Sequence, residues 1–200
     1  TRECIFVTGC SGSGKSYWTK NYCENYNMLH KGKSPIYLIS SLTEDSTLDS
    51  AKCKISRVSL DAIVDDPIDL NSGDLDNSLL IFDDWDVVEN EKGKDGRKYA
   101  DVLWKLLNDT LTMGRHNGIT VICISHYNTI GQKGRLILTE STAYTVYPHG
   151  TSAHALKYLL NHHVGISTAE IGRLGDYGRW CTVRKNFPKF LVSEHSVKLI

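Results

Sequence analysis

The chain has 200 residues, 40% of them apolar, and its 23 basic and 23 acidic side chains give a formal net charge of zero. This length and apolar fraction predict one domain whose buried core needs neither disulfides nor a metal, and the lack of any apolar run of about 18 residues excludes a membrane-spanning helix. Neutrality removes the basic bias that points directly to nucleic acid, but it does not exclude DNA as a partner.

The N-terminus and the cysteines both favour an intracellular protein. The first seven residues lack the long apolar segment and the cleavage site of a signal peptide, and the missing initial methionine indicates a trimmed chain. Six cysteines, at positions 4, 10, 23, 53, 123 and 181, show no Cys-x-x-Cys spacing, which argues against zinc. We therefore expect a reducing setting.

Apolar runs and helical spacing predict alternating strands and helices over the first 150 residues. We expect buried strands at residues 5–7, 36–39, 79–82, 121–124 and 143–147, a weaker segment at 54–60, and helices from 15 to about 25 and over 99–113. Residues 61–76 are acidic and turn-rich, and residues 89–98 form a charged loop. This alternation predicts an α/β fold with a mostly parallel central sheet flanked by helices.

The last 50 residues have a different pattern. Two short helices are expected at residues 151–163 and 168–174, capped by Thr151 and Ser167. A β-hairpin is expected from residues 180–184 and 190–192 around Asn186-Phe187-Pro188. We interpret residues 1–200 as a single domain with a core over about 1–150 and a small helical and β-hairpin appendage over about 151–200.

Residues 9–16 match the P-loop pattern G-x-x-x-x-G-K-[ST] at every fixed position. Its glycines let backbone amides approach a phosphate, and the following helix directs its positive end to the same place. Lys15 is expected to reach the β- and γ-phosphates, and the Ser16 hydroxyl to bind Mg²⁺. A chance Gly-Ser-rich turn would lack the flanking strand and helix. The predicted nucleotide contacts are Gly9, Cys10, Ser11, Gly12, Ser13, Gly14, Lys15 and Ser16, with Tyr17 as a further candidate.

The apolar strand at residues 79–82 ends in Asp83 and Asp84, as a Walker B strand does. A central strand delivers a carboxylate to the carboxyl edge of the sheet, beside the P-loop. Asp83 is expected to hold Mg²⁺, mostly through water, and Asp84 to polarise the attacking water. Many hydrolases of this type use Glu as the base, so Asp84 is a shorter substitute. The competing interpretation is a solvated Asp-Asp turn.

Polar residues also follow the next strand and the long helix before it. Ser125 and His126 end the strand at residues 121–124, where ATPases with an extra strand between the P-loop and Walker B strands carry a γ-phosphate sensor. Arg115 follows the helix at 99–113 and is a candidate arginine finger for a neighbouring subunit's site. A polar turn and a solvated arginine at a helix end are the alternatives.

Taken together, these motifs resemble the viral DNA-packaging ATPases of the FtsK–HerA superfamily, the poxvirus, giant-virus and virophage type. The resemblance rests on residues 9–16, on residues 79–84, and on Gly114-Arg115-His116 followed by the strand that ends at Ser125. The C-terminal pattern Gly178-Arg179-Trp180, Asn186-Phe187-Pro188 and Glu194-His195 is similar as well. One departure is His126, which stands where the superfamily usually has Gln and whose charge titrates near neutral pH.

The resemblance implies a RecA-like P-loop fold and an ATP- and Mg²⁺-dependent motor that moves double-stranded DNA into a preformed capsid. It implies a homo-oligomeric ring, pentameric or hexameric, with capsid, portal or vertex proteins as partners and no insertion into a membrane. The expected location is the host cytoplasm or viral factory, with possible association with the virion. Lys15, Asp83, Asp84, Arg115, Ser125 and His126 would be the catalytic set, with Ser16 and Asp83 on the metal.

Two alternatives remain open at this stage: a small P-loop nucleoside or nucleotide kinase, and a non-viral HerA-like translocase. The one arginine and three lysines of the 89–98 loop could serve a kinase lid, whereas Arg115 and the polar-tipped strand fit hydrolysis better. Two basic segments are candidates for gripping DNA phosphates; their residues are Lys92, Lys94, Arg97 and Lys98 in one and Lys133 and Arg135 in the other.

Overall fold

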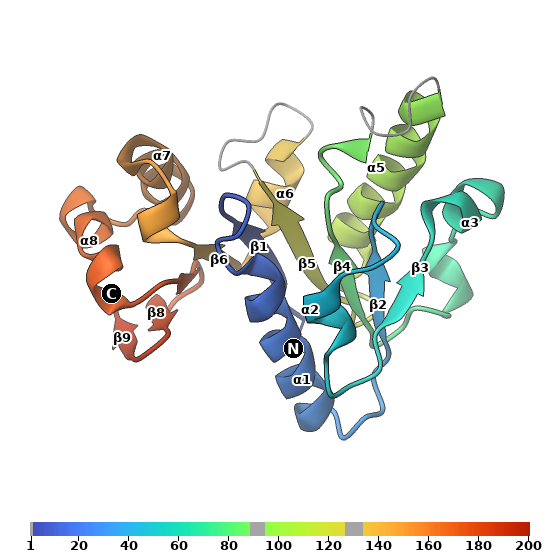
Figure 1. The fold of residues 1–200 in the computed structure, drawn as a ribbon, viewed down its shortest axis with the longest axis horizontal. Helices are drawn as coiled ribbons and strands as arrows, with labels where there is room; N and C mark the ends of the chain where they lie inside the picture. Colours follow the sequence, from blue (N-terminus) through green and yellow to red (C-terminus); the bar gives the residue numbers. More distant parts are fainter. Residues whose placement is uncertain (1, 89–94, 127–133) are drawn as a thin grey trace. The chain divides into compact units, whose positions relative to one another are not determined.

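A computed structural model describes residues 2–88, 95–126 and 134–200 (Figure 1). The chain divides into two compact units. The first unit contains Arg2 and residues 14–124, and the second contains residues 3–13 and 125–200. Each unit is described below by itself, and the single-domain interpretation of residues 1–200 stays a prediction.

The first unit is built on parallel strands in the order β3-β2-β4-β5. Their bounds are β2 Ile36–Ile39, β3 Ser56–Val58, β4 Leu79–Phe82 and β5 Thr120–Ser125, whose last residue belongs to the second unit. Leu38 pairs with Ile81, and Ile81 pairs with Ile122. Because the strands are parallel, their carboxyl ends share one edge, which is where ligands bind in such sheets.

Helices of the first unit pack on these strands. They are α1 Lys15–Leu29, α2 Ser46–Asp49, α3 Leu60–Asp65, η1 Leu70–Ser72 and α5 Gly96–Met113. α5 buries one apolar stripe at helical spacing, formed by Ala100, Leu103, Leu106, Leu107 and Leu111. Every residue of β4 and β5 is buried, as expected for the centre of a sheet covered on both faces.

The second unit combines one parallel and three antiparallel strand pairs. β1 Cys4–Thr8 pairs in parallel with β6 Ala143–Val146, and antiparallel pairs continue through β7 Cys181–Arg184, β8 Phe190–Ser193 and β9 Val197–Leu199. Its helices are α6 Arg135–Glu140, η4 Pro148–Gly150, α7 Ala153–Val164, α8 Thr168–Gly172 and η5 Leu174–Tyr177. Among the described helices, none has the length and apolarity to cross a bilayer.

The predicted strands and the α/β class are confirmed, and the main errors concern short helices. The stretch expected to be turns contains α3 and η1, and α2, α6 and β9 were not predicted. α5 begins at Gly96, so Gly96 to Lys98 are helical and not loop. Ser152, not Thr151, caps α7, because its Oγ accepts the Ala155 amide at 3.2 Å. The Ser167 cap is confirmed and forms a capping box with Glu170.

Candidate functional site

The Gly-rich turn between β1 and α1 has the backbone of an anion-binding loop. Gly12 and Gly14 adopt left-handed φ angles of 74° and 102°, which residues with a Cβ adopt only at a cost. Inside the turn, the Ser13 amide donates to the Cys10 carbonyl at 3.2 Å. A Cβ on Gly9 would lie 2.7 Å from the Ser13 hydroxyl. The turn is therefore closed tightly around its own backbone, as a phosphate-binding nest requires.

Helix α1 begins with a glycine and carries no negative charge near its start. Gly14 is its N-cap residue, makes no side-chain cap, and is followed by no acidic residue in the first turn. The helix dipole adds positive potential at this end. Lys15, only 7% exposed, adds a full positive charge at the same end. This end of α1 is suited to bind a polyanion.

Asp83 stands buried at the carboxyl end of β4. It is 8% exposed, and its amide donates to the Ile39 carbonyl at the end of β2 at 2.9 Å. Burial, and then the negative charges of Asp84 and Asp45, raise the pKa of Asp83 to about 7, while Lys15 opposes the rise. Two predicted site residues, Lys15 and Asp83, thus lie close enough within the first unit for the charge of Lys15 to lower the pKa of Asp83.

The donors at this site fit a Mg²⁺ ion shared with a triphosphate. The Ser16 hydroxyl and the Asp83 carboxylate are hard oxygen ligands of the kind Mg²⁺ takes. The pKa of Asp83 is raised because its carboxylate is buried and lies near the negative charges of Asp84 and Asp45. A bound cation would offset both effects. Among the described residues no group of three or more His, Cys, Asp or Glu side chains could hold a metal alone, so phosphate oxygens and water would complete the shell.

Asp84 occupies a strained backbone conformation. Its φ is 55°, a left-handed value that costs a residue with a Cβ roughly 1–2 kcal/mol. Its carbonyl accepts the Val87 amide at 3.2 Å, and the next residue, Trp85, is 3% exposed and packs edge-to-face on Trp104 with ring centroids 4.9 Å apart. The buried indole fixes the turn, so strain at Asp84 is held where an orienting carboxylate is predicted.

Asp45 is a third carboxylate near Asp83 that the sequence analysis missed. It caps α2, and one of its oxygens accepts the amides of Thr47 and Leu48 at 2.8 and 2.9 Å. α2 is tied to α1 through the hydrogen bond from Lys20 Nζ to Ser50 Oγ at 2.9 Å. The only sequence signal was an N-cap residue soon after the strand at residues 36–39.

Ser125 and His126 lie at the end of β5. Within the second unit, a backbone hydrogen bond connects Ser125 to the first glycine of the P-loop. The Ser125 carbonyl accepts the Gly9 amide at 3.4 Å, and Ser125 is fully buried. His126 is half-buried. The backbone bond places the predicted sensor segment beside the first glycine of the loop. The remaining loop residues Cys10 and Ser11 are exposed, as is Tyr17 at 53%.

Arg115 lies at the opposite end of the first unit from Lys15. Its turn follows α5, and Asn117 in that turn bonds to Asn77, just before β4 begins. Helix α1 runs the length of the unit between these ends, about 22 Å for its 15 residues at 1.5 Å each. Arg115 is exposed, and its side chain has no hydrogen bond or ion pair within the described residues. It is therefore out of reach of the Lys15 and Asp83 of its own chain.

The predicted DNA-gripping residues are only partly described. Lys92, Lys94 and Lys133 lie outside the described residues. Arg97 and Lys98 are exposed in the first turn of α5, and Arg135 is exposed as the first residue of α6. The last three therefore stand on helices and not in loops.

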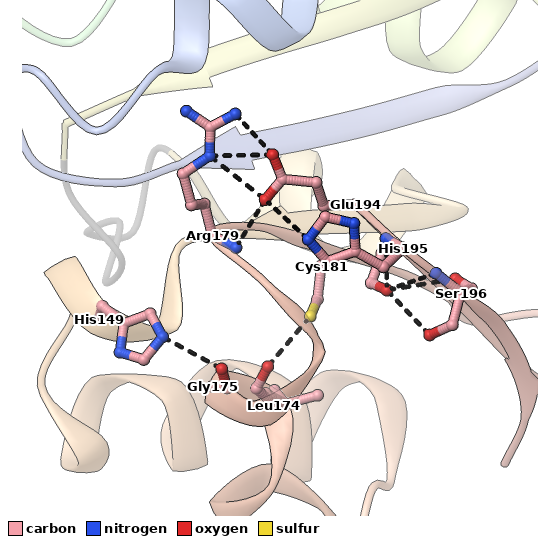
Figure 2. Close-up of polar contacts among 9 residues, drawn as sticks. His149, Leu174, Gly175, Arg179, Cys181, Glu194, His195 and Ser196 are labelled. Carbon is pink, nitrogen blue, oxygen red and sulfur yellow. Dashed lines mark hydrogen bonds and ion pairs between the residues drawn. The ribbon is translucent and has the colours of Figure 1, made fainter.

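The C-terminal pattern singled out in the sequence forms a clasp across β7 and β8 (Figure 2). Arg179 precedes β7 and Glu194 follows β8; Arg179 Nε donates to Glu194 Oε1 at 2.9 Å, and the Arg179 amide to Glu194 Oε2 at 3.1 Å. These bonds lower the pKa of Glu194 to about 2. Gly178 has φ 129°, and a Cβ there would lie 2.9 Å from the Cβ of Glu194. The pattern thus has a structural role in closing the hairpin.

Tyr147 is a second residue that the sequence analysis did not identify. Its ring lies against the P-loop, since a Cβ on Gly9 would be 2.8 Å from Tyr147 Cδ2. Tyr147 is 3% exposed, and its hydroxyl has no partner among the described residues. It follows β6 directly, so the only signal was a polar aromatic residue at a strand end.

Comparisons with known proteins agree on the fold. No protein-family model matches the chain. It is 29% identical over 204 residues to the uncharacterised protein V3 of the Sputnik virophage, covering all of this chain and 78% of that protein. The genome packaging NTPase B204 of Sulfolobus turreted icosahedral virus 2, in complex with ATP-gammaS, aligns at 16% identity and a TM-score of 0.57, over 99% of this chain and 96% of that one.

A second similar structure comes from a different system. The pCW3 conjugation coupling protein TcpA, with ATPgS, aligns at 12% identity and a TM-score of 0.56, over 98% of this chain and 59% of that one. At such identities the solved structures establish the fold. The chain has the fold of a P-loop NTPase, and its resemblance to viral packaging ATPases is confirmed at that level.

Proposed function

We propose that this chain is the ATP-hydrolysing subunit of a motor that packages viral double-stranded DNA into a preformed capsid. The observation that carries the proposal is the fold shared over almost the whole chain with B204, a genome packaging NTPase solved with AMPPCP and with ATP-gammaS. The buried Lys15 at the head of α1 and the buried Asp83 after β4 support the same conclusion, because they supply the positive and negative charges that a Mg²⁺-triphosphate needs.

In this proposal each site residue has a defined task. The amides of residues 9–16 and the head of α1 bind the phosphates, and Lys15 neutralises the β- and γ-phosphates. Ser16 and Asp83 would hold Mg²⁺, which when bound screens the negative charge on the phosphates. Asp84 orients the attacking water, and Ser125 or His126 senses the γ-phosphate.

Completion of the site requires a second copy of the chain. Arg115 is exposed and about one helix length, about 22 Å, from its own Lys15. We therefore assign it to the site of a neighbouring subunit in a homo-oligomeric ring of five or six, where it would stabilise transition-state charge. The ring would act on DNA and on a capsid, portal or vertex protein, in the host cytoplasm, the viral factory or the virion.

DNA-dependent turnover tests the motor. Steady-state ATPase rates are measured with and without double-stranded DNA, and nucleosides and nucleotides are offered as phosphate acceptors. We expect DNA to raise the rate and no acceptor to become phosphorylated. A rate indifferent to DNA together with a phosphorylated nucleoside would identify a small P-loop kinase instead.

Subunit mixing tests the shared site. Lys15→Ala subunits cannot hold ATP but keep Arg115, and Arg115→Ala subunits keep an intact P-loop. We expect each variant alone to be nearly inactive and their mixture to recover activity, because mixed neighbours assemble complete sites. Arg173→Ala removes an exposed arginine after α8 and is the matched control, expected to retain the wild-type rate. Failure of the mixture to recover would remove Arg115 from the mechanism.

A further inference from the structure

The turn that carries Arg115, residues 114–118, is held in one conformation; we call it the arginine turn. The Ile119 amide closes it by donating to the Gly114 carbonyl at 2.9 Å. Gly118 has a left-handed φ of 68°, and a Cβ on Gly114 would collide with the Thr110 carbonyl oxygen. The backbone that carries the exposed Arg115 is therefore held in place.

Asn77 fastens the arginine turn to the segment before β4. Its amide donates to the Asn117 carbonyl at 2.8 Å, and Asn77 itself has a left-handed φ of 55°. Its side chain covers Gly118, because a Cβ there would lie 2.6 Å from Asn77 Oδ1. Asn117 also donates from Nδ2 to the Leu70 carbonyl at 2.6 Å. A movement of Asn77 would therefore move the turn.

Tyr26, in the last turns of α1, contacts this assembly through its hydroxyl. Tyr26 Oη donates to the Asn77 carbonyl at 3.5 Å, and the side chain is only 6% exposed. Burial raises the pKa of Tyr26, and hydrogen bonding with Ser34 and Thr120 opposes the rise. Asn77 precedes β4. The hydroxyl thus joins the last turns of α1 to the segment that leads into β4.

Helix α1 connects Tyr26 rigidly to the phosphate-binding end. The helix is 15 residues long and begins at Lys15. A ladder of rings at four-residue spacing runs along one side, with centroid separations of 5.5 Å for Trp18–Tyr22, 6.4 Å for Tyr22–Tyr26 and 4.1 Å for Tyr26–His30. All three pairs are nearly parallel, with interplanar angles of 22–24°. Such i, i+4 contacts stabilise a helix against bending and fraying.

We propose that Tyr26 is a positioning residue that ties the arginine turn to helix α1, so that the phosphate-binding end of α1 in one subunit and the arginine it offers to the next move as one body. This inference rests on the proposed action of Arg115 in a neighbouring site. When the γ-phosphate leaves, the head of α1 loses a ligand, and a shift there is carried along the helix to Asn77 and the turn. ATP occupancy in one subunit then sets the geometry of catalysis in the next, which is a coupling between two distinct sites.

The test uses Tyr26→Phe, which keeps the ring in the ladder and removes only the hydroxyl. We expect kcat of the assembled protein to fall roughly ten-fold, because a small displacement of a catalytic group has effects of this order or larger, with the affinity of the monomer for ATP unchanged. The dependence of rate on ATP concentration should also lose cooperativity. Tyr37→Phe is the matched control, since Tyr37 is half-buried in β2 and its hydroxyl has no hydrogen bond in the described part of the chain.

Double variants and mixtures separate this inference from the proposed function. Tyr26→Phe added to Arg115→Ala should cost no further activity, because the tie acts only through Arg115. Tyr26→Phe subunits mixed with Asp84→Asn subunits should recover, because the latter keep the P-loop, Tyr26 and Arg115 and so donate well-placed arginines. If the double variant loses activity by the product of the two single losses, or if Tyr26→Phe has a normal kcat, Tyr26 does not act through Arg115. The proposed role of Arg115 in the neighbouring site would stand. An Arg115→Ala protein with normal turnover would instead overturn the shared site and this inference with it.

Discussion

Replacement of Asp83 by Asn should stabilise the nucleotide-free protein while abolishing its chemistry. Burial, then the charges of Asp84 and Asp45, raise the pKa of Asp83 from 3.8 to about 7, and Lys15 offsets part of the rise. The folded state therefore binds a proton more tightly than the unfolded chain. The contribution of the Asp83 proton to the free energy of unfolding is fully present below about pH 4, where the group is protonated in both states. This contribution falls as pH rises and is lost above about pH 7.

The size of this effect follows from the shift. A rise of about three pKa units corresponds to about 4 kcal/mol, at 1.36 kcal/mol per unit. Asn has nearly the same shape and no charge, so it escapes this loss. We expect Asp83→Asn to exceed the wild type in unfolding free energy by on the order of 2–4 kcal/mol at pH 8 and to match it near pH 4. For a chain of this size the gain at pH 8 is a rise in melting temperature on the order of 10 °C.

Thermal denaturation in EDTA from pH 4 to 8, without nucleotide, measures the difference. Asp101→Asn, an exposed site on α5, is the matched control and should change little at any pH. Addition of Mg²⁺ and ATP should stabilise the wild type by mass action and stabilise Asp83→Asn less, because the variant lacks one of the two residues proposed to hold Mg²⁺. A variant no more stable than wild type at pH 8 would refute the argument that uncompensated charge is stored at Asp83.

Three further changes test individual local features. Asp84→Gly should raise the unfolding free energy by about 1 kcal/mol, because Gly accepts φ 55° without strain, and should lower kcat sharply; chemical denaturation and ATPase rates read out the two effects, and a less stable variant would contradict the strain. Ser152→Ala should cost about 1 kcal/mol through loss of the α7 cap, whereas Thr151→Ala should cost less; equal losses in denaturant titrations would contradict the assignment. The bonds from Arg179 lower the pKa of Glu194, so the stabilisation that they give is lost as pH falls from 4.5 to about 2. Glu194→Gln should remove this part of the acid sensitivity. Melting temperatures measured at acid pH check it, and they should fall more steeply for the wild type than for the variant.

Central strands and the P-loop could be predicted because their signals are local. Residues 36–39 and 79–82 are unbroken apolar runs, and both are strands with those bounds. The P-loop needs only its own glycines and the adjacent elements. α2 and α3, by contrast, have four and six residues, too few to show a period, and they depend on caps from Asp45 and Ser59. Short helices of this kind are set by tertiary contacts that no window of sequence contains.

Several residues that the structure brings to the candidate site or to the arginine turn could not be predicted from their spacing in the sequence. Asp45 acts on Asp83 although 38 residues separate them in the chain, because parallel strands bring β2 and β4 together at one edge. Tyr26 and Asn77 meet by the same topology at the other edge. Neither residue belongs to a recognised pattern, so only the fold could bring them into the argument.

The placement of Arg115 constrains how such a molecule can work. Parallel strands collect Lys15 and Asp83 where they end, and the arginine turn lies where they begin, so the two halves of the proposed site face away from each other within the first unit. No side-chain rearrangement closes the distance of about 22 Å between Arg115 and Lys15 of one chain. A neighbouring subunit can bring its own Arg115 close if the edge where its strands begin faces the edge where these strands end. A heterologous contact of this kind repeats around a closed ring. In the proposed motor, the stiffness of α1 between the two ends is therefore what allows each subunit to respond to its own nucleotide by acting on the next.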